Sequence, residues 1–287
     1  MSATRPRAAL GRGTLVVLLA IYSLFPIYMM TILSLKTAQE DIHGNPFFVR
    51  HPNFEWYLDL FEPSEWVRGE LAVPTVPYLV WIKNTAIVFA ATIALTLTAS
   101  LMAAYAIGRL RPPGWRWWRR ALFATYLLPQ TLLFLPMYQL VLKLGLDNSL
   151  AALVLIYPML TMPFCVWLLS AYFQRLSPEV EESAYIEGAS RWTAVLRIVL
   201  PMSWPVIVAA GIFALGTISS DMMFASLLLP NQANQTLSAG LSGMDVGLED
   251  LTVVAGVNMA ALTVVPIHGI FAGAFVRGLT AAMIEGA

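Results

Sequence analysis

The stretch 84-NTAIVFAATIALTLTASLMAAYAIG-108 runs for 25 residues without a Lys, Arg, Asp or Glu. The hydrocarbon core of a bilayer is about 30 Å thick, and a helix needs about 20 apolar residues to cross it. Because lipid offers no hydrogen-bond partner to the backbone, a segment that crosses must satisfy its own N–H and C=O groups, as an α-helix does. We therefore predict that 84–108 is a transmembrane helix.

Five other stretches share this character and extend the prediction to the whole chain. They cover residues 13–35, 121–142, 148–174, 198–220 and 251–276. The 287 residues are 58% hydrophobic and 12% charged, whereas a soluble domain carries about 25% charged residues. This composition excludes a soluble protein. The six spans predict an all-α integral membrane protein that forms one transmembrane domain over 1–287.

Two segments bear on the number of spans. The first stretch could be a signal peptide, since Arg5, Arg7 and Arg12 precede it. Its apolar run is longer than the ~7–15 residues of a signal core, so we expect a retained helix. A further uncharged stretch, 222–244, includes the polar segment 230–236, and we expect most of it to be loop.

The basic residues are divided unevenly between the two sides of the predicted membrane. Twelve of the 17 Lys and Arg residues fall on one side: Arg5, Arg7, Arg12, Arg109, Arg111, Arg116, Arg119, Arg120, Arg175, Arg191, Arg197 and Arg277. Cytoplasmic connections carry an excess of Lys and Arg, so both termini are predicted to be cytoplasmic. Residues 36–83 then form an external loop, in which 53–61 is either a short surface helix or part of a plain solvated connection. The net charge is zero, which gives no support for a nucleic-acid partner.

The connection between the fourth and fifth stretches, 177–201, carries the most specific local pattern. Ser177-Pro178-Glu179 is typical of a helix start, with a capping hydroxyl, a proline in the first turn and an acid near the positive end of the helix dipole. Gly188 can end that helix in a left-handed conformation, and Ser190 can cap a second one. Apolar residues recur at helical spacing in this second helix: Trp192, Val195, Leu196 and Val199. From the residues alone, this is either a part that docks on a soluble partner or an ordinary interfacial connection.

A resemblance favours the docking interpretation. The segment Glu182-Ser-Ala-Tyr-Ile-Glu-Gly188, followed by Ile198 and Leu200-Pro201, resembles the motif E-A-A-x3-G-x9-I-x-L-P. This EAA motif belongs to the permease subunits of binding-protein-dependent ABC importers, in which it forms the loop that couples to the ATPase. One core position departs from it, because Ser183 stands where alanine is usual. The coupling loop implied by the resemblance is 177–197, and its candidate residues, with the motif's end, are Glu181, Glu182, Ser183, Ala184, Glu187, Gly188, Ala189, Ile198, Leu200 and Pro201.

Other segments are similar to the carbohydrate-uptake branch of that family, which includes the second permease of the maltose transporter. They are distributed over nearly the whole chain and include 26–36, 103–109, Leu144-Gly-Leu146, Gln235-Thr-Leu237 and 277–280. The family's frequent Trp-Asn-Glu/Asp at the external end of the fifth span is Ser219-Ser220-Asp221 here, a departure that bears on the substrate class more than on the transporter class.

The resemblance implies a type I importer permease in the bacterial or archaeal inner membrane. Its partners would be a homologous second permease, a dimer of cytoplasmic ATPase subunits and an extracytoplasmic solute-binding protein. The solute would be a sugar or oligosaccharide moved by alternating access, or alternatively a non-sugar solute. The chain has no phosphate loop of the form G-x4-G-K-[ST]. ATP and Mg would therefore be bound by the ATPase subunits, and we expect neither enzymatic activity nor a cofactor or metal in this chain.

Polar residues within or beside the spans are candidates for the translocation pathway. A charged group at membrane depth faces a cavity or a partner, so Asp221 is a candidate, unless the fifth span ends just before it. The other candidates, each of which could equally form an interhelical hydrogen bond, are Asn84, Gln130 and Asn258. In the resembling family the external segment before the last span meets the binding protein. We accordingly predict such contacts for Asn231, Gln232, Asn234 and Gln235, the alternative being that this segment, 230–250, is a simple solvent loop.

Two other classes of membrane protein fit the sequence less well. An intramembrane enzyme needs catalytic or metal-binding side chains that converge, and His268 is the one histidine within a predicted span. An ion-coupled carrier usually has acids or histidines within several spans, and Asp221 is the one borderline acid.

Overall fold

The computed structural model describes residues 5–61, 77–244 and 251–283, and no strand occurs in these ranges. The chain divides into two compact units. Unit 1 comprises residues 1–78 and 243–264, and unit 2 comprises residues 79–242 and 265–287. Within the described ranges, four helices are long and apolar enough to cross a membrane: Gly13–Ser34, Tyr78–Leu110, Leu150–Phe173 and Leu251–Gly278. The number rises to six if each of two bent helix pairs counts as one span. The prediction of an all-α membrane protein is confirmed.

Unit 1 is built from the N-terminal helix and part of the external loop. Its helices are α1 (Arg5–Ser34), α2 (Ala38–His43), α3 (Glu55–Leu58) and the first part of α14 (Leu251–Met283). Helix α3 lies within 53–61, where a short surface helix was one of the two alternatives. The predicted loop 36–83 ends earlier than expected, because α4 begins at Tyr78.

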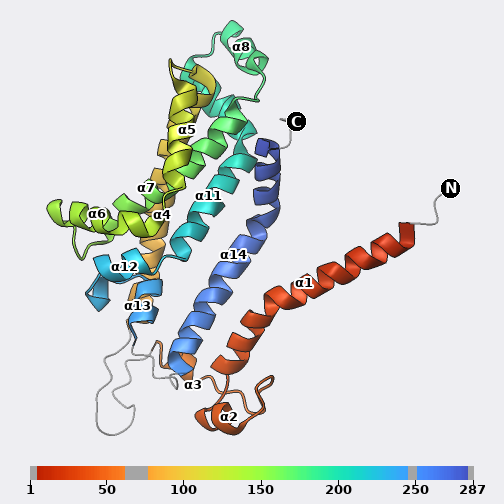
Figure 1. Cartoon of the computed structure of the whole chain (residues 1–287), viewed down its shortest axis with the longest axis vertical. Helices are drawn as coiled ribbons and strands as arrows, with labels where there is room; N and C mark the ends of the chain where they lie inside the picture. Colours follow the sequence, from red (N-terminus) through yellow and green to blue (C-terminus); the bar gives the residue numbers. More distant parts are fainter. Residues whose placement is uncertain (1–4, 62–76, 245–250, 284–287) are drawn as a thin grey trace. The chain divides into compact units, whose positions relative to one another are not determined.

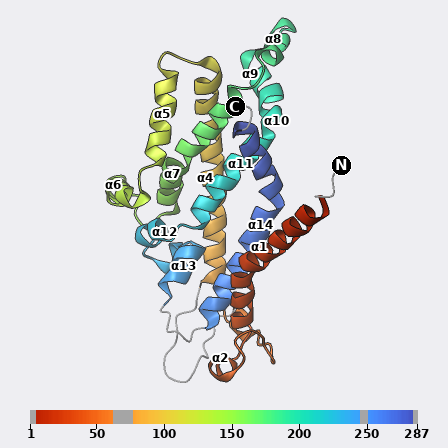
Figure 2. The same cartoon turned by 45° about the vertical axis from the view of Figure 1, so that its right-hand side comes forward.

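Unit 2 has three long helices that run side by side in both views (Figures 1 and 2). They are α4 (Tyr78–Tyr105), α7 (Leu150–Phe173) and α11 (Trp204–Ser219). The core between them includes Cys165 of α7 and Ala210 of α11, both with 0% exposure. Small side chains let these two helices approach closely, and the Cys165 Sγ lies 3.6 Å from the Ala210 carbonyl oxygen.

The third predicted span is not one helix. Its residues fall in α5 (Trp115–Tyr126) and α6 (Gln130–Lys143), which meet at 95°. Pro129 explains the break, because a proline disfavours helical geometry at the preceding residue and cannot donate a backbone hydrogen bond. Helix α5 packs on α7 through Phe123 and Trp167, whose ring centroids are 4.9 Å apart, while α6 turns away from α5 (Figure 1).

The fifth predicted span is also bent. Helix α9 (Arg191–Ala194) continues through a π-helical turn, η2 (Val195–Val199), into α10 (Leu200–Met202), and α11 follows at 74°. Pro201 and Pro205 flank the break, and neither can donate a backbone hydrogen bond. A second π turn, η1 (Ala106–Leu110), extends α4.

The expectation that 222–244 is mostly loop is wrong. Helices α12 (Met223–Leu228) and α13 (Leu237–Gly243) occupy much of it, joined through the short 3-10 helix η3 (Gln232–Asn234). Tertiary packing decides this, since Phe224, Leu228 and Ala239 are buried in a second core cluster with α7.

Candidate functional site

The segment 177–201 folds as its sequence predicts. Helix α8 (Pro178–Ile186) begins at Ser177, whose Oγ accepts a hydrogen bond from the Glu179 N–H at 3.3 Å. Gly188 has a φ of +85°, the left-handed conformation that costs glycine nothing. Ser190 then caps α9 by accepting a hydrogen bond from the Thr193 N–H at 3.2 Å. The predicted helix, glycine turn and second helix are confirmed as local structure.

Helix α8 lies at one end of unit 2, beyond the end of α5 (Figures 1 and 2). It presents a mixed surface to its surroundings. Glu182, as expected, is exposed, and Ile186 beside it is 87% exposed. An apolar side chain held in the open at the tip of a helix, between acidic neighbours, suits contact with another protein. Of the other predicted coupling residues, Ser183, Glu187 and Gly188 are exposed, Ala189, Ile198 and Leu200 are half-buried, Pro201 is exposed and Ala184 is buried.

Glu181 anchors α8 to the end of α4. Its Oε1 pairs with the Arg109 Nε at 2.6 Å, and each side chain is only 10% exposed. The Oε2 atom accepts hydrogen bonds from the hydroxyls of Tyr105 at 3.0 Å and Tyr185 at 3.2 Å. The remaining Arg109 nitrogens donate to the carbonyl oxygens of Leu176 at 2.7 Å and Ser177 at 3.2 Å. We call the set Tyr105, Arg109, Glu181 and Tyr185 the anchor cluster.

The anchor cluster was not predicted from the sequence. Arg109 and Glu181 are 72 residues apart, and Arg109 counted only as one of many basic residues at the membrane edge. One sequence signal was available: Arg109, at the end of the second span, and Glu181, in the first turn of the cytoplasmic helix, fall on the same side of the predicted membrane. A buried ion pair whose remaining donors and acceptors are also satisfied favours one fixed arrangement. Helix α8 is therefore held rigidly against α4.

At the opposite end of unit 2, η3 is tied to the start of α4. Asn84 donates through Nδ2 to the carbonyl oxygens of Ala233 at 3.1 Å and Gln235 at 2.9 Å. Trp81 Nε1 donates to the Gln232 carbonyl at 2.7 Å. The four residues predicted to contact a binding protein lie here: Asn231 and Gln232 are exposed, and Asn234 and Gln235 are half-buried. The predicted external segment is 230–250, and its last residues, 245–250, lie outside the described residues.

The pathway candidates have different surroundings. Asp221 is half-buried and accepts hydrogen bonds from the Tyr157 hydroxyl at 2.8 Å and from the backbone N–H groups that open α12. Gln130 is exposed at the start of α6. In unit 1, Asn258 is fully buried and donates to Ser34 Oγ and the Tyr57 hydroxyl, both at 2.9 Å. Asn84 and Asn258 thus make the interhelical or helix–loop bonds that were the alternative interpretation, and a pathway role stays a prediction for all four residues.

Comparison with known proteins places the chain in a family. Residues 2–281 match the family described as the binding-protein-dependent transport system inner membrane component. The chain belongs to this family. It is an ABC importer permease, a class of transport subunits that act together with other ABC subunits.

Relatives of this permease are similar along almost its whole length. The trehalose/maltose transport system permease protein MalG of Thermococcus litoralis is 29% identical, over 94% of each chain. The sulfoquinovosyl glycerol transport system permease protein SmoH of Agrobacterium fabrum is 27% identical, over 94% of this chain and 91% of that one. Among solved structures, a chain of a bacterial ABC transporter involved in the import of the acidic polysaccharide alginate shares the fold, with a TM-score of 0.75, 16% identity and coverage of 94% and 97%.

Proposed function

We propose that this permease is one of two homologous membrane subunits of an ATP-driven importer that carries a sugar or oligosaccharide. The observation that carries the proposal is the rigid mounting of α8 through the buried Glu181–Arg109 pair. A coupling element has to move as one body with the spans, because a flexible connection would absorb the motion of a partner instead of transmitting it. The carbohydrate named in the descriptions of several relatives supports the substrate class.

In the proposed mechanism, two cytoplasmic ATPase subunits bind ATP and Mg and close on each other. The closure pushes α8 through its exposed face, at Glu182 and Ile186. The anchor cluster passes this displacement to α4, and the continuous run from α9 to α10 passes it toward α11. The spans then change from inward-open to outward-open, and this subunit performs no covalent chemistry.

On the external side, a solute-binding protein delivers the sugar. We assign its contact to η3 and the residues that flank it, at Asn231, Gln232, Asn234 and Gln235, of which the first two are exposed. Hydrogen bonds from Asn84 and Trp81 fix this segment, so a contact made there would act on α4 directly. In this arrangement the protein is a multi-pass component of the inner membrane, with both termini cytoplasmic.

Ligand identification with the cognate binding protein tests the proposal. A thermal-shift screen of that protein against sugars, oligosaccharides, amino acids and peptides should give a shift with a carbohydrate. The same carbohydrate should enter proteoliposomes that contain both permeases and the ATPase, and uptake should require ATP and the binding protein. Uptake without ATP would contradict the ATP-driven mechanism, and a shift with an amino acid or peptide alone would contradict the sugar assignment.

A further inference from the structure

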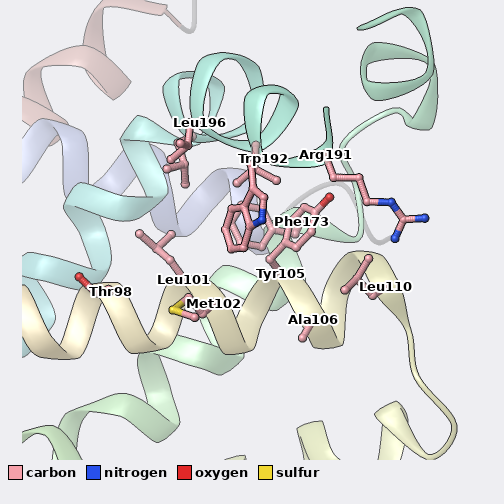
Figure 3. Close-up of a pocket in the computed structure, with 12 residues that line it drawn as sticks. Thr98, Leu101, Met102, Tyr105, Ala106, Leu110, Phe173, Arg191, Trp192 and Leu196 are labelled. Carbon is pink, nitrogen blue, oxygen red and sulfur yellow. The ribbon is translucent and has the colours of Figure 1, made fainter. Parts of the chain in front are cut away.

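Unit 2 contains an apolar cavity of about 540 Å³ beside the C-terminal part of the coupling loop, 177–197. Figure 3 shows its walls: α4 and η1 on one side, with Leu101, Met102 and Tyr105, and α9 and η2 on the other, with Trp192 and Leu196. Trp192 and Leu196 are 69% and 59% exposed, although both are large apolar side chains. The apolar stripe predicted for the second helix therefore faces this cavity, and of its four residues only Val199 is buried in the core of the chain.

The dimensions of the cavity match one leaflet of a membrane. Its lining along α4 and η1 extends from Thr98 to Leu110, a length of about 18 Å at ~1.5 Å per helical residue. Half of a hydrocarbon core is about 15 Å thick. Thr98 lies in the middle of a span, and Leu110 ends it, so the cavity extends from the membrane interior to the interface. Its volume is within the ~300–1,000 Å³ of pockets that hold small molecules.

Both π-helical turns of unit 2 border this cavity, Ala106 and Leu110 coming from η1, and Val195 and Leu196 from η2. A π turn interrupts the regular α-helical hydrogen-bond pattern and is frequent at functional sites. In unit 2, the two turns lie on facing walls, so the cavity lies where two helical backbones depart from α-helical geometry.

A single cation marks the interfacial end. Arg191 lines the cavity at the same end as Leu110, and its side chain extends outward from the apolar cluster (Figure 3). Within the described part of the chain, no hydrogen bond or ion pair engages this side chain. The nearby Arg109, by contrast, is bonded to Glu181 and to two carbonyl oxygens. Arg191 is thus available to an external anion next to an apolar slot.

We propose that this cavity is a binding site for an anionic phospholipid, with one acyl chain in the slot and the phosphate on Arg191. Pockets between transmembrane helices that carry a basic residue on the cytoplasmic side favour anionic headgroups. The apolar lining accepts a lipid tail and would not hold water, which needs several polar partners. Because α9 and η2 form one wall and α4 forms the other, the bound lipid would hold α9 and η2 in place relative to α4.

Spin-labelled lipids test the proposal on the full chain in nanodiscs of phosphatidylcholine. A trace of phosphatidylglycerol with a nitroxide on its acyl chain should show an immobilised component, stronger than that of labelled phosphatidylcholine. Arg191→Gln should reduce this preference about fivefold, the change expected when one basic contact is lost. Ala106→Phe, which fills the slot, should remove the immobilised component for both lipids. Arg197→Gln is the matched control, because it removes the same charge one to two turns further along from an exposed residue that does not line the cavity.

Three outcomes would overturn the site. One is an unchanged preference for phosphatidylglycerol in Arg191→Gln. Another is an equal loss in Arg197→Gln, which would indicate a diffuse surface charge. The third is the disappearance of the immobilised component when the complex with the second permease and the ATPase is reconstituted, which would make a helix of the partner permease the occupant.

Discussion

Removal of Arg109 should release the coupling helix from the spans. In Arg109→Ala, Glu181 would stay buried but keep only the two tyrosine hydroxyls as partners. Breaking a buried ion pair by deleting one partner costs about 3–5 kcal/mol. Because the tyrosines still bond the carboxylate, we expect the lower end of that range, about 3 kcal/mol. That corresponds to a shift of about a hundredfold in the ratio of docked to undocked α8.

Hydrogen–deuterium exchange in nanodiscs measures this ratio locally, since amides exchange through opening of their own segment. Peptides that cover 178–190 should exchange about a hundredfold faster in Arg109→Ala, while peptides from α7 keep their wild-type rate. Arg109→Lys should be intermediate, since lysine retains the charge but cannot reproduce the forked contacts to Glu181 and the two carbonyl groups. Arg120→Ala is the matched control, because Arg120 is exposed on α5 and outside the anchor cluster.

A double-mutant cycle identifies the pair as the cause. The exchange increase in Arg109→Met combined with Glu181→Gln should be smaller than the sum of the two single effects, because the second change removes the unpaired buried charge left by the first. Wild-type exchange in Arg109→Ala, or strictly additive effects in the cycle, would refute the reasoning that this pair holds α8.

Other expected outcomes concern the turn, the external segment and the topology. Gly188→Ala should destabilise the turn by about 1–2 kcal/mol, because φ is +85° although the space around a Cβ is open. Co-purification of the ATPase should fall with Gly188→Ala, fall further with Gly188→Val and be largely kept by Gly188→Asn. Equal recovery of all three variants would show that the turn does not control docking. Asn84→Leu should destabilise the η3 attachment by about 1–3 kcal/mol and lower binding-protein stimulation of ATPase activity, which stays at the wild-type level if η3 makes no such contact. On intact cells, an impermeant thiol reagent should label a single cysteine at position 232 and leave one at position 120 unlabelled, against a low background because Cys165 is buried. Labelling at 120 alone would reverse the orientation.

The amino-acid sequence by itself determined the features that depend on neighbouring residues. The length of an uncharged stretch such as 84–108 is sufficient to predict a span, because lipid imposes the same requirement on any segment that crosses it. The helix start at Ser177 and the turn at Gly188 are likewise local, since a capping hydroxyl and a left-handed glycine act within a few residues. Pro129 and Pro201 also carried local signals for the bends near them, which a search for apolar length alone does not detect.

Only the tertiary structure decided which residues meet across the chain. The pairing of Glu181 with Arg109 depends on how the end of α4 lies against α8, and many arginines on the same side of the membrane satisfy the same sequence pattern. The cavity beside Trp192 likewise depends on how α4 and η1 lie opposite α9 and η2. Hydrophobicity is non-directional: it places a residue in lipid or protein, whereas its partners follow from packing that involves residues distant in the sequence.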